Sequence, residues 1–274
     1  MSTTTWVPDE IPLDRPSAAR IYDYFLGGYH NFEIDRVAAE RLMEVAPVVR
    51  LSSWVNRAFL RRCVRFLVGQ GIDQFLDVGS GIPTVGNVHQ VAQELNPAAR
   101  IVYVDIDPIA VAHSRAILQD NPNATAIRGD AREPDQILQH AEVRRLLDFS
   151  KPAAVLFLAV LQLVPDDDQA YHAVRTLCDA LIPGSYLAIS HPTSEDAPPE
   201  LLQQINKLTT AAPTVYQYRP HAKIRRLFDG LELVDPGLVH TPLWRPEGPD
   251  DVLLDQPERA FCLAGVGLKP QIAA

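Results

Sequence analysis

Short apolar runs alternate with amphipathic stretches from residue 74 onward, and this alternation constrains the fold more than any other feature. The apolar runs lie at 75–78, 100–105, 124–128, 153–158 and 185–190. Helical periodicity occupies the intervals near 84–95, 108–119 and 166–181. Because the runs are continuously apolar, the pattern predicts a parallel sheet that is covered by helices on both faces.

Two later segments depart from this alternation. Residues 231–234 and 260–266 are apolar runs joined by a Pro-rich loop that is too short for a crossover helix, which predicts an antiparallel pair at the sheet edge. Residues 191–219 interrupt the pattern and are predicted to be an insertion with a helix at 199–210.

The N-terminal part of the chain is helical in pattern. Predicted helices cover 17–25, 33–46 and a third segment that starts near Ser52 or Ser53. Ser17 is a candidate cap for the first helix, and Pro47 ends the second. The sequence therefore predicts a helical segment at 1–71 and a sheet-bearing domain at 72–274.

Charge and cysteine content exclude several classes of protein. The formal charge of −9 argues against sequence-independent binding to nucleic acid or to an anionic membrane. No apolar run approaches the roughly 20 residues that span a bilayer, and residues 1–10 lack the pattern of a secretory signal. Cys63, Cys178 and Cys262 are far apart and fit reduced thiols. We expect a cytoplasmic protein that binds neither nucleic acid nor membrane.

A glycine-rich turn follows the first predicted strand, in the order Asp77, Val78, Gly79, Ser80, Gly81. Such a turn lets the backbone approach a ligand closely, although it can also serve only as a tight corner. A dinucleotide fingerprint requires a third glycine, and Thr84 holds that place here. Asp77 instead supplies a carboxylate that suits a cationic or amino-bearing ligand.

Carboxylates stand at three consecutive strand ends, at Asp77, Asp105 and Asp130. The carboxyl ends of parallel strands meet at one edge of a sheet, where open α/β sheets bind their ligands. Asp105 is placed to accept hydrogen bonds from ribose hydroxyls, and Asp130 with the N–H of Ala131 is placed to read an adenine. Asp107 is interpreted as a helix N-cap.

The order of these motifs resembles the class I S-adenosylmethionine-dependent methyltransferases. The motifs are 77–81, Asp105, 129–130, 159–161 and 181–185. More narrowly, the chain resembles a bacterial family of S-adenosyl methyltransferases that was formerly described as a domain of unknown function. The segments typical of that family are 20–28, 31–32, 81–84, His89, 103–108 and 244–246. The resemblance extends from about residue 14 to the C-terminus.

The resemblance implies an α/β fold with a doubly wound, mostly parallel, Rossmann-like sheet of seven strands, the last antiparallel. It implies S-adenosylmethionine as cofactor and N-terminal helices that form a lid over the cofactor mouth. The implied cofactor-binding residues are Asp77, Gly79, Ser80, Gly81, Asp105, Ile106, Asp130, Ala131 and Ala159. Gly79 and Gly81 are expected at the methionine part, Asp105 at the ribose and Ile106 near the adenine. Relatives commonly carry a His where this chain has Gln162, and a Gln cannot act as a base.

No residue is assigned a catalytic role from the sequence. Methyl transfer from a sulfonium depends mainly on alignment, and the candidates for a base or an acceptor-binding group are Tyr22, Tyr24, His30 and His191. The tyrosines fit better as aromatic side chains that pack the N-terminal helices on the core, and His30, on a loop, fits better as a solvated or capping residue. Residues 166–168 are interpreted as the cap of a helix, and no spacing matches a zinc site, so no metal is predicted.

The acceptor is expected to be a small molecule. Residues 158–161 do not form the Asn/Asp-Pro-Pro-aromatic loop that grips a nucleic-acid base in related enzymes, and no Pro-Cys nucleophile follows a strand. The sequence thus predicts a methyltransferase with an unidentified acceptor. The alternatives are a non-catalytic binder of S-adenosylmethionine or S-adenosylhomocysteine, and a nicotinamide-dependent oxidoreductase. The oligomeric state stays open.

Overall fold

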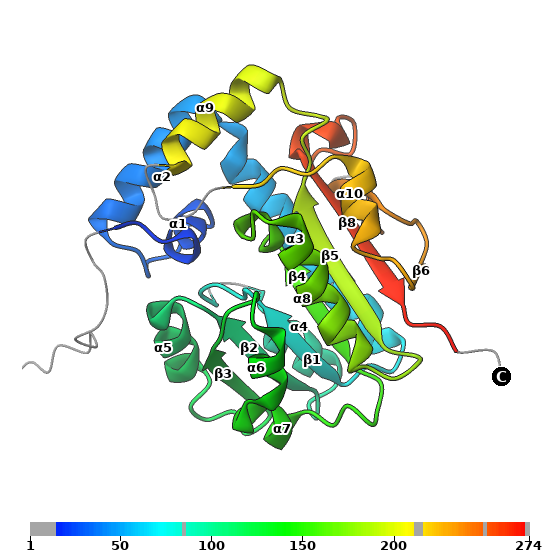
Figure 1. Cartoon of the computed structure of the whole chain (residues 1–274). Coiled ribbons are helices and arrows are strands. Elements are labelled where there is room, and N and C mark those ends of the chain that lie inside the picture. The colour runs from blue at the N-terminus through cyan, green and yellow to red at the C-terminus, as the bar shows by residue number, and fades with distance from the viewer. Residues whose placement is uncertain (1–14, 84–85, 211–215, 249–250, 272–274) are drawn as a thin grey trace, which may run out of the picture.

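The computed structural model describes the chain except residues 1–14, 84–85, 211–215, 249–250 and 272–274. One mixed sheet has the order β3-β2-β1-β4-β5-β8-β6, and β7 pairs with β8 beside this path (Figure 1). The strands are β1 (Gln74–Val78), β2 (Arg100–Asp105), β3 (Ala124–Arg128), β4 (Ala154–Leu158), β5 (Tyr186–Pro192), β6 (Glu232–Leu233), β7 (Val239–His240) and β8 (Cys262–Leu268). β1 to β5 are parallel and β8 is antiparallel to β5. This confirms the predicted doubly wound sheet.

The far edge of the sheet differs in one detail from the seven strands that were expected. Seven strands lie along the path, and the eighth, β7, continues the edge that β6 begins. β6 pairs with one end of β8 at Leu268, and β7 pairs with the other end at Leu263. Pro236 lies between the two short strands and has no N–H for a ladder bond. The predicted antiparallel pair at this edge is confirmed.

Helices cover both faces of the sheet. They are α3 (Val48–Gly69), α4 (Val88–Leu95), α5 (Pro108–Ile117), α6 (Pro134–Gln139), α7 (Ala141–Leu146), α8 (Asp167–Asp179) and α10 (His221–Arg226). Strand residues alternate between two cores: Phe75 packs with side chains of α3, α4 and α5. Leu76 packs with side chains of α6, α7 and α8. α3 begins earlier than predicted, directly after Pro47, since proline is compatible with the first turn of a helix.

Three helices lie together beyond the carboxyl ends of the parallel strands (Figure 1). They are α1 (Ala18–Phe25), α2 (Glu33–Val45) and α9 (Pro199–Thr210), and α9 coincides with the helix predicted inside residues 191–219. Their apolar sides form a third cluster, in which Phe25, Leu42 and Ile205 are buried. We call these three helices the roof.

A buried ion network fastens the roof to the sheet domain. Arg20 on α1 donates from Nε to Asp35 on α2 over 2.7 Å and from Nη1 to Asp107 over 3.2 Å. All three side chains are buried. Asp107 also accepts from the backbone N–H of Ile109 over 2.8 Å, which confirms it as the N-cap of α5. Removing one partner of such a network leaves an uncompensated buried charge.

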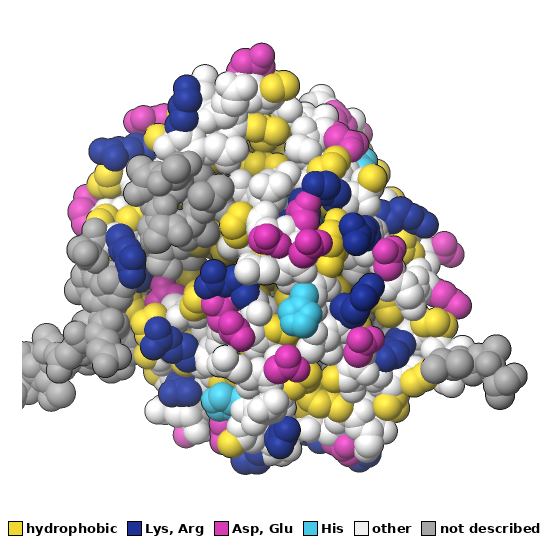
Figure 2. Space-filling model, viewed as in Figure 1, with side chains coloured by type: hydrophobic (Ala, Val, Ile, Leu, Met, Phe, Trp, Pro, Cys, Tyr) yellow, Lys and Arg dark blue, Asp and Glu magenta, His cyan; other side chains and the backbone are white. Residues whose placement is uncertain are grey.

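Charged side chains do not segregate by sign on the face shown in Figure 2, where Lys and Arg are interspersed with Asp and Glu. Among the described residues, no helix combines the length and apolar character needed to cross a membrane.

Candidate functional site

A cavity of about 910 Å³ lies between the roof and the carboxyl ends of β1 to β4. It sits where the strand order reverses between β1 and β4, which is the usual ligand position in a doubly wound sheet. All the residues predicted from the sequence to bind the cofactor line it: Asp77, Gly79, Ser80, Gly81, Asp105, Ile106, Asp130, Ala131 and Ala159. The structure thus brings these dispersed residues together around one space.

The turn after β1 requires its first glycine. Gly79 has φ +73, and a Cβ there would lie 2.1 Å from Cγ2 of Val160. Its N–H and that of Ser80 donate to the carbonyl of Val104 over 2.8 and 3.1 Å, which fixes the turn on β2. Gly81 has φ +65, and no atom lies within 4 Å of the position that a Cβ would take. A ligand in the cavity can therefore approach the backbone closely at this residue.

Asp105 is held rigidly at the end of β2. Its Oδ2 accepts from the N–H of Gly81 over 2.7 Å, and its Oδ1 accepts from the N–H of Asp107 over 2.9 Å. Burial raises its pKa to about 6, although these backbone hydrogen bonds act to lower it. Each carboxylate oxygen retains a second lone pair, so Asp105 can still accept hydrogen bonds from a ligand.

Asp77 and Arg57 place opposite charges at the floor of the cavity. Burial raises the pKa of Asp77 to about 7, while the guanidinium of Arg57 acts to lower it and Asp105 raises it. Arg57 projects from α3, is buried, and donates from Nη1 to Asn87 over 3.3 Å. Its Nε has no partner among the described residues. Sequence reasoning missed Arg57, because nothing local in a helix shows that one arginine faces a strand end.

The turn after β4 completes this side of the cavity. Ala159 has φ 54, and its N–H donates to the carbonyl of Ser190 over 3.1 Å. Gln162 donates from Nε2 to the carbonyl of Ala159 over 2.7 Å, which holds the turn. Oε1 of Gln162 is buried without a described partner. A residue noted only as a departure from the family pattern therefore lines the cavity and carries a free acceptor.

Asp130 is tied to its neighbour at the end of β3. Arg132 donates from Nε and Nη2 to this carboxylate over 2.9 and 2.5 Å. Burial acts to raise the pKa of Asp130, but the hydrogen bonds and charge of Arg132 hold it below its ordinary value. Ala131 follows directly, and Ile106 also lines the cavity with an exposed side chain.

Tyr22 lines the cavity, but its hydroxyl group is engaged. It donates to the carbonyl of Ser53 over 3.1 Å and accepts from Nδ2 of Asn56 over 2.9 Å. Burial raises its pKa. Oδ1 of Asn56 accepts in turn from Ser190 over 2.6 Å, so the hydroxyl belongs to a chain that joins α1, α3 and β5. Tyr24 points elsewhere and donates to Glu40 over 3.1 Å.

His191 and His30 are not among the described residues that line the cavity. His191 is fully buried, with Nδ1 2.8 Å from the carbonyl of Pro192 and Nε2 2.8 Å from Nη1 of Arg219. Burial and the charge of Arg219 lower its pKa to about 3, so the ring is neutral. The ring of His30 instead lies against His113, with centroids 4.1 Å apart.

Asp166 caps α8, as predicted, through a hydrogen bond of 2.9 Å from the N–H of Gln169.

The part of the cavity below the roof is largely apolar. Its walls come from α2, α3, α9, the segment after α9 and the turn before β8: Leu42, Val49, Leu201, Leu202, Ile205, Tyr216, Tyr218 and Phe261. The sequence predicts apolar N-terminal helices that would suit a small acceptor, but it does not assign any of these residues to a ligand site, since apolar helix positions are indistinguishable from ordinary core positions.

Comparison with known proteins decides the family. A sequence profile described as S-adenosyl methyltransferase matches residues 4–270. The chain belongs to the S-adenosyl methyltransferase family. Its cofactor is S-adenosylmethionine, and it has the fold of a Rossmann-like methyltransferase. No protein in a search of curated sequences matched.

Two crystal structures of similar proteins cover nearly the whole S-adenosyl methyltransferase chain. A provisionally assigned methyltransferase from Thermobifida fusca YX is 41% identical, with a TM-score of 0.90, over 98% of this chain and 100% of that one. A DUF574 family protein from Streptomyces avermitilis is 35% identical, with a TM-score of 0.87, over 94% and 98%. Human N-acetylserotonin methyltransferase in complex with its methyl donor shares the fold at 17% identity and a TM-score of 0.50, over 94% of this chain and 63% of that one.

Proposed function

We propose that this methyltransferase transfers the methyl group of S-adenosylmethionine to an apolar small molecule held under the roof. The observation that carries the proposal is a continuous cavity that runs from the acidic strand ends to an apolar chamber. Its volume of about 910 Å³ is near the top of the roughly 300–1,000 Å³ range of ligand pockets. That volume favours room for a second molecule beside the cofactor.

The charged groups at the strand ends fit the cofactor. We assign Asp105 to the ribose hydroxyls, Ile106, Asp130 and Ala131 to the adenine, and the turn of Gly79, Ser80 and Gly81 to the methionine part, next to Ala159. Asp77 supplies a carboxylate for the ammonium group. Arg57 supplies a free N–H donor for the carboxylate of the same amino-acid part.

The chain's own contribution to the reaction is alignment and exclusion of water. The cofactor supplies an activated methyl group when it is bound, so that in-line placement of the acceptor provides most of the acceleration. Neither Tyr22 nor His191 is placed to take a proton, since the hydroxyl of Tyr22 already donates to Ser53 and His191 lies outside the cavity. The acceptor we propose is therefore one that reacts without a strong protein base.

The roof is proposed to act as a lid. It contains α1 and α2 from the N-terminal segment, together with α9. It covers the apolar chamber above the strand ends, and a chamber covered in this way favours a small acceptor over a macromolecular one. The cysteines of the chain are unpaired, which supports the cytoplasmic location that we propose.

A transfer assay tests this function. The full chain is incubated with methyl-labelled cofactor and a panel of planar aromatic and aliphatic phenols and amines, and the products are separated. We expect label in at least one apolar member of the panel.

Leu202→Trp, which fills the apolar chamber, should reduce the rate of methyl transfer at least tenfold with unchanged cofactor affinity. The control Ile117→Trp changes an exposed residue of α5 and should retain the rate. Cofactor binding without transfer to any acceptor, cell extract included, would instead support a non-catalytic binder.

A further inference from the structure

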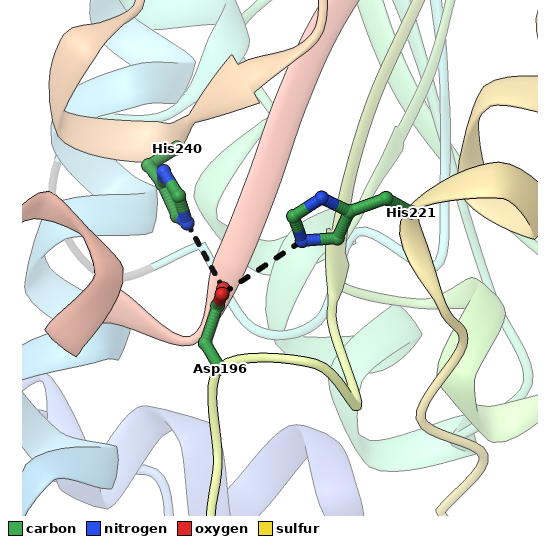
Figure 3. A group of neighbouring side chains, drawn as sticks. All are labelled: Asp196, His221 and His240. Carbon is green, nitrogen blue, oxygen red and sulfur yellow. Dashed lines mark hydrogen bonds and ion pairs between the residues drawn. The ribbon is translucent and has the colours of Figure 1, made fainter.

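Three side chains from separate segments of the chain meet near the segment that leads into α9. Asp196 lies between β5 and α9, His221 is the first residue of α10 and His240 is the last residue of β7. One ligand atom from each lies within 4.8 Å of the others. Figure 3 shows both imidazole rings directed at the one carboxylate. The sequence predicts no metal here, because the three residues do not form a recognisable spacing.

The cluster contains an unsatisfied polar atom. Nε2 of His240 lies 2.9 Å from Oδ2 of Asp196, which is a hydrogen bond. Nε2 of His221 lies 3.8 Å from Oδ1 of the same carboxylate, which is too long for one. That nitrogen is buried and has no hydrogen-bond partner in the described part of the chain. The carboxylate of Asp196 thus accepts a hydrogen bond from His240, whereas Nε2 of His221 lies nearby without one.

Glu195 orients His221. Its Oε1 accepts from the backbone N–H of His221 over 3.0 Å, and its Oε2 lies 3.4 Å from Nδ1 of the ring. A carboxylate beside Nδ1 favours the tautomer with the proton on that nitrogen, which is the usual arrangement behind a metal-bound histidine. The lone pair of Nε2 then points at the carboxylate of Asp196. Two electron-rich atoms in this position repel each other unless a cation lies between them.

The spacing of the ligand atoms fits a small divalent ion. Zinc bonds of about 2.0–2.2 Å in a tetrahedral site place neighbouring ligand atoms about 3.4 Å apart. The two carboxylate oxygens of Asp196 lie on either side of that value, with Oδ2 2.9 Å from Nε2 of His240 and Oδ1 3.8 Å from Nε2 of His221, and all three ligand atoms lie within 4.8 Å of one another. Two imidazoles and one carboxylate are ligands that suit Zn²⁺, whereas Mg²⁺ and Ca²⁺ prefer oxygen ligands.

We propose that Asp196, His221 and His240 bind a Zn²⁺-class divalent ion, with water in the fourth position and Glu195 as a positioning residue. Binding replaces the hydrogen bond between His240 and Asp196, and the neutral ring of His240 changes tautomer, so that the proton leaves Nε2 and a proton from solvent is held on Nδ1. The two carboxylates make the site formally anionic before the metal binds, which favours a cation.

The position of the site indicates a structural role. Ala197, next to Asp196, lines the ligand cavity and leads into α9. His240 belongs to the strand that pairs with β8. A bound ion would therefore tie the start of α9, and with it one wall of the acceptor chamber, to the edge of the sheet and to α10.

Metal binding to the full chain tests the site directly. The purified protein is stripped with a chelator, dialysed, and titrated with Zn²⁺ by calorimetry, with Mg²⁺ as the comparison ion. We expect one Zn²⁺ per chain, no saturable binding of Mg²⁺, and a higher thermal midpoint with Zn²⁺ present. Co²⁺ should give the intense visible absorption of a tetrahedral site.

Variants separate this site from adventitious binding. His221→Ala and His240→Ala should each weaken Zn²⁺ binding at least tenfold, and Glu195→Gln should weaken it less. His172→Ala, which removes an exposed histidine of α8, should bind like the parent chain. Circular dichroism of the stripped variants shows whether they fold. Absence of saturable Zn²⁺ binding to the parent chain, or equal affinity in folded His221→Ala and His240→Ala, would overturn the proposal.

Discussion

Arg219 donates a hydrogen bond from Nη1 to Nε2 of His191 over 2.8 Å, and both side chains are fully buried. The same guanidinium donates to the carbonyls of Leu161 and Val164 and to Asp167. An arginine can only donate, so His191 must accept and therefore stays neutral. This pair fixes the chain where it returns from α9 to the sheet.

The stability of the folded chain should fall in acid because His191 is buried as a neutral ring. The pKa of His191 is about 3 in the folded chain against 6.5 in the unfolded chain. Below pH 6.5 the unfolded state gains a proton that the folded state does not, so stability falls as the pH drops toward 3. We expect the free energy of unfolding in urea to fall more steeply between pH 7 and pH 4 in the parent chain than in His191→Gln. Identical slopes would contradict the buried neutral ring.

Cofactor affinity should rise with pH through the titration of Asp77. Burial raises its pKa to about 7, so the carboxylate that we assign to the ammonium group is mostly protonated at pH 6 and mostly ionised at pH 8. Affinity for S-adenosylmethionine should increase by about tenfold in total across that range, because the ionised fraction of Asp77 rises by about that factor. Calorimetry at several pH values checks this, and Asp77→Asn should flatten the profile. A pH-independent affinity in the parent chain would refute the assignment.

Replacement of Asp105 tests the ribose contact. Asp105→Ala removes the acceptor that we assign to the ribose hydroxyls, and should weaken cofactor binding by about 1.5–3 kcal/mol. It also leaves the N–H groups of Gly81 and Asp107 without their partner, so the thermal midpoint has to be measured in parallel. A well-folded variant with unchanged affinity would remove Asp105 from the site.

The turn after β1 should not tolerate a methyl group at its first glycine. Gly79→Ala forces a left-handed backbone on alanine and a contact with Val160. Overpacking alone costs about 1–3 kcal/mol. Gly81→Ala meets open space and should cost less stability. Urea unfolding checks the argument in both variants, in Val160→Gly and in Gly79→Ala combined with Val160→Gly. Val160→Gly removes the three nearest atoms that the new Cβ would meet, so Gly79→Ala should cost less stability in that background, and an unchanged cost would count against the clash.

The hydroxyl group of Tyr22 should contribute to the free energy of unfolding but have little effect on the rate of methyl transfer. Tyr22→Phe leaves the carbonyl of Ser53 and Nδ2 of Asn56 without this partner, at a cost of about 1–3 kcal/mol. Cofactor affinity and the transfer rate per folded molecule should stay within a few-fold of the parent values. A loss of transfer of a hundredfold or more in a folded variant would show that the hydroxyl acts on the acceptor.

The sheet and its ligand edge could be predicted because their signals are local. Each buried parallel strand is a short apolar run. Asp77 and Asp105 lie within the last two residues of such a run, and Asp130 lies two residues after one. Parallel topology then brings the three ends to the same edge. Asp107 could be recognised as a cap because the proline after it marks the first turn of a helix.

The remaining features depend on contacts between distant segments. α6 and α7 have six residues each, too few for a helical period to stand out. Arg57 comes near enough to affect the pKa of Asp77 only through the packing of α3. His191 stays neutral in the core because Arg219, a residue distant in the sequence, donates to it. Asp196, His221 and His240 converge only because β5, α10 and the β8 edge are neighbours.

α3 belongs to both halves of the molecule. Asn56 and Arg57 face the cavity from its first half, while Cys63 and Leu67 are locked in the core of the sheet. A helix of 22 residues is about 33 Å long and bends little. Under the proposed function, α3 therefore stays in place during ligand exchange, and any movement belongs to α1, α2 and α9. The guanidinium of Arg57, which we assign to the cofactor's carboxylate, is then already in position before S-adenosylmethionine binds. Binding therefore loses little side-chain entropy at this residue.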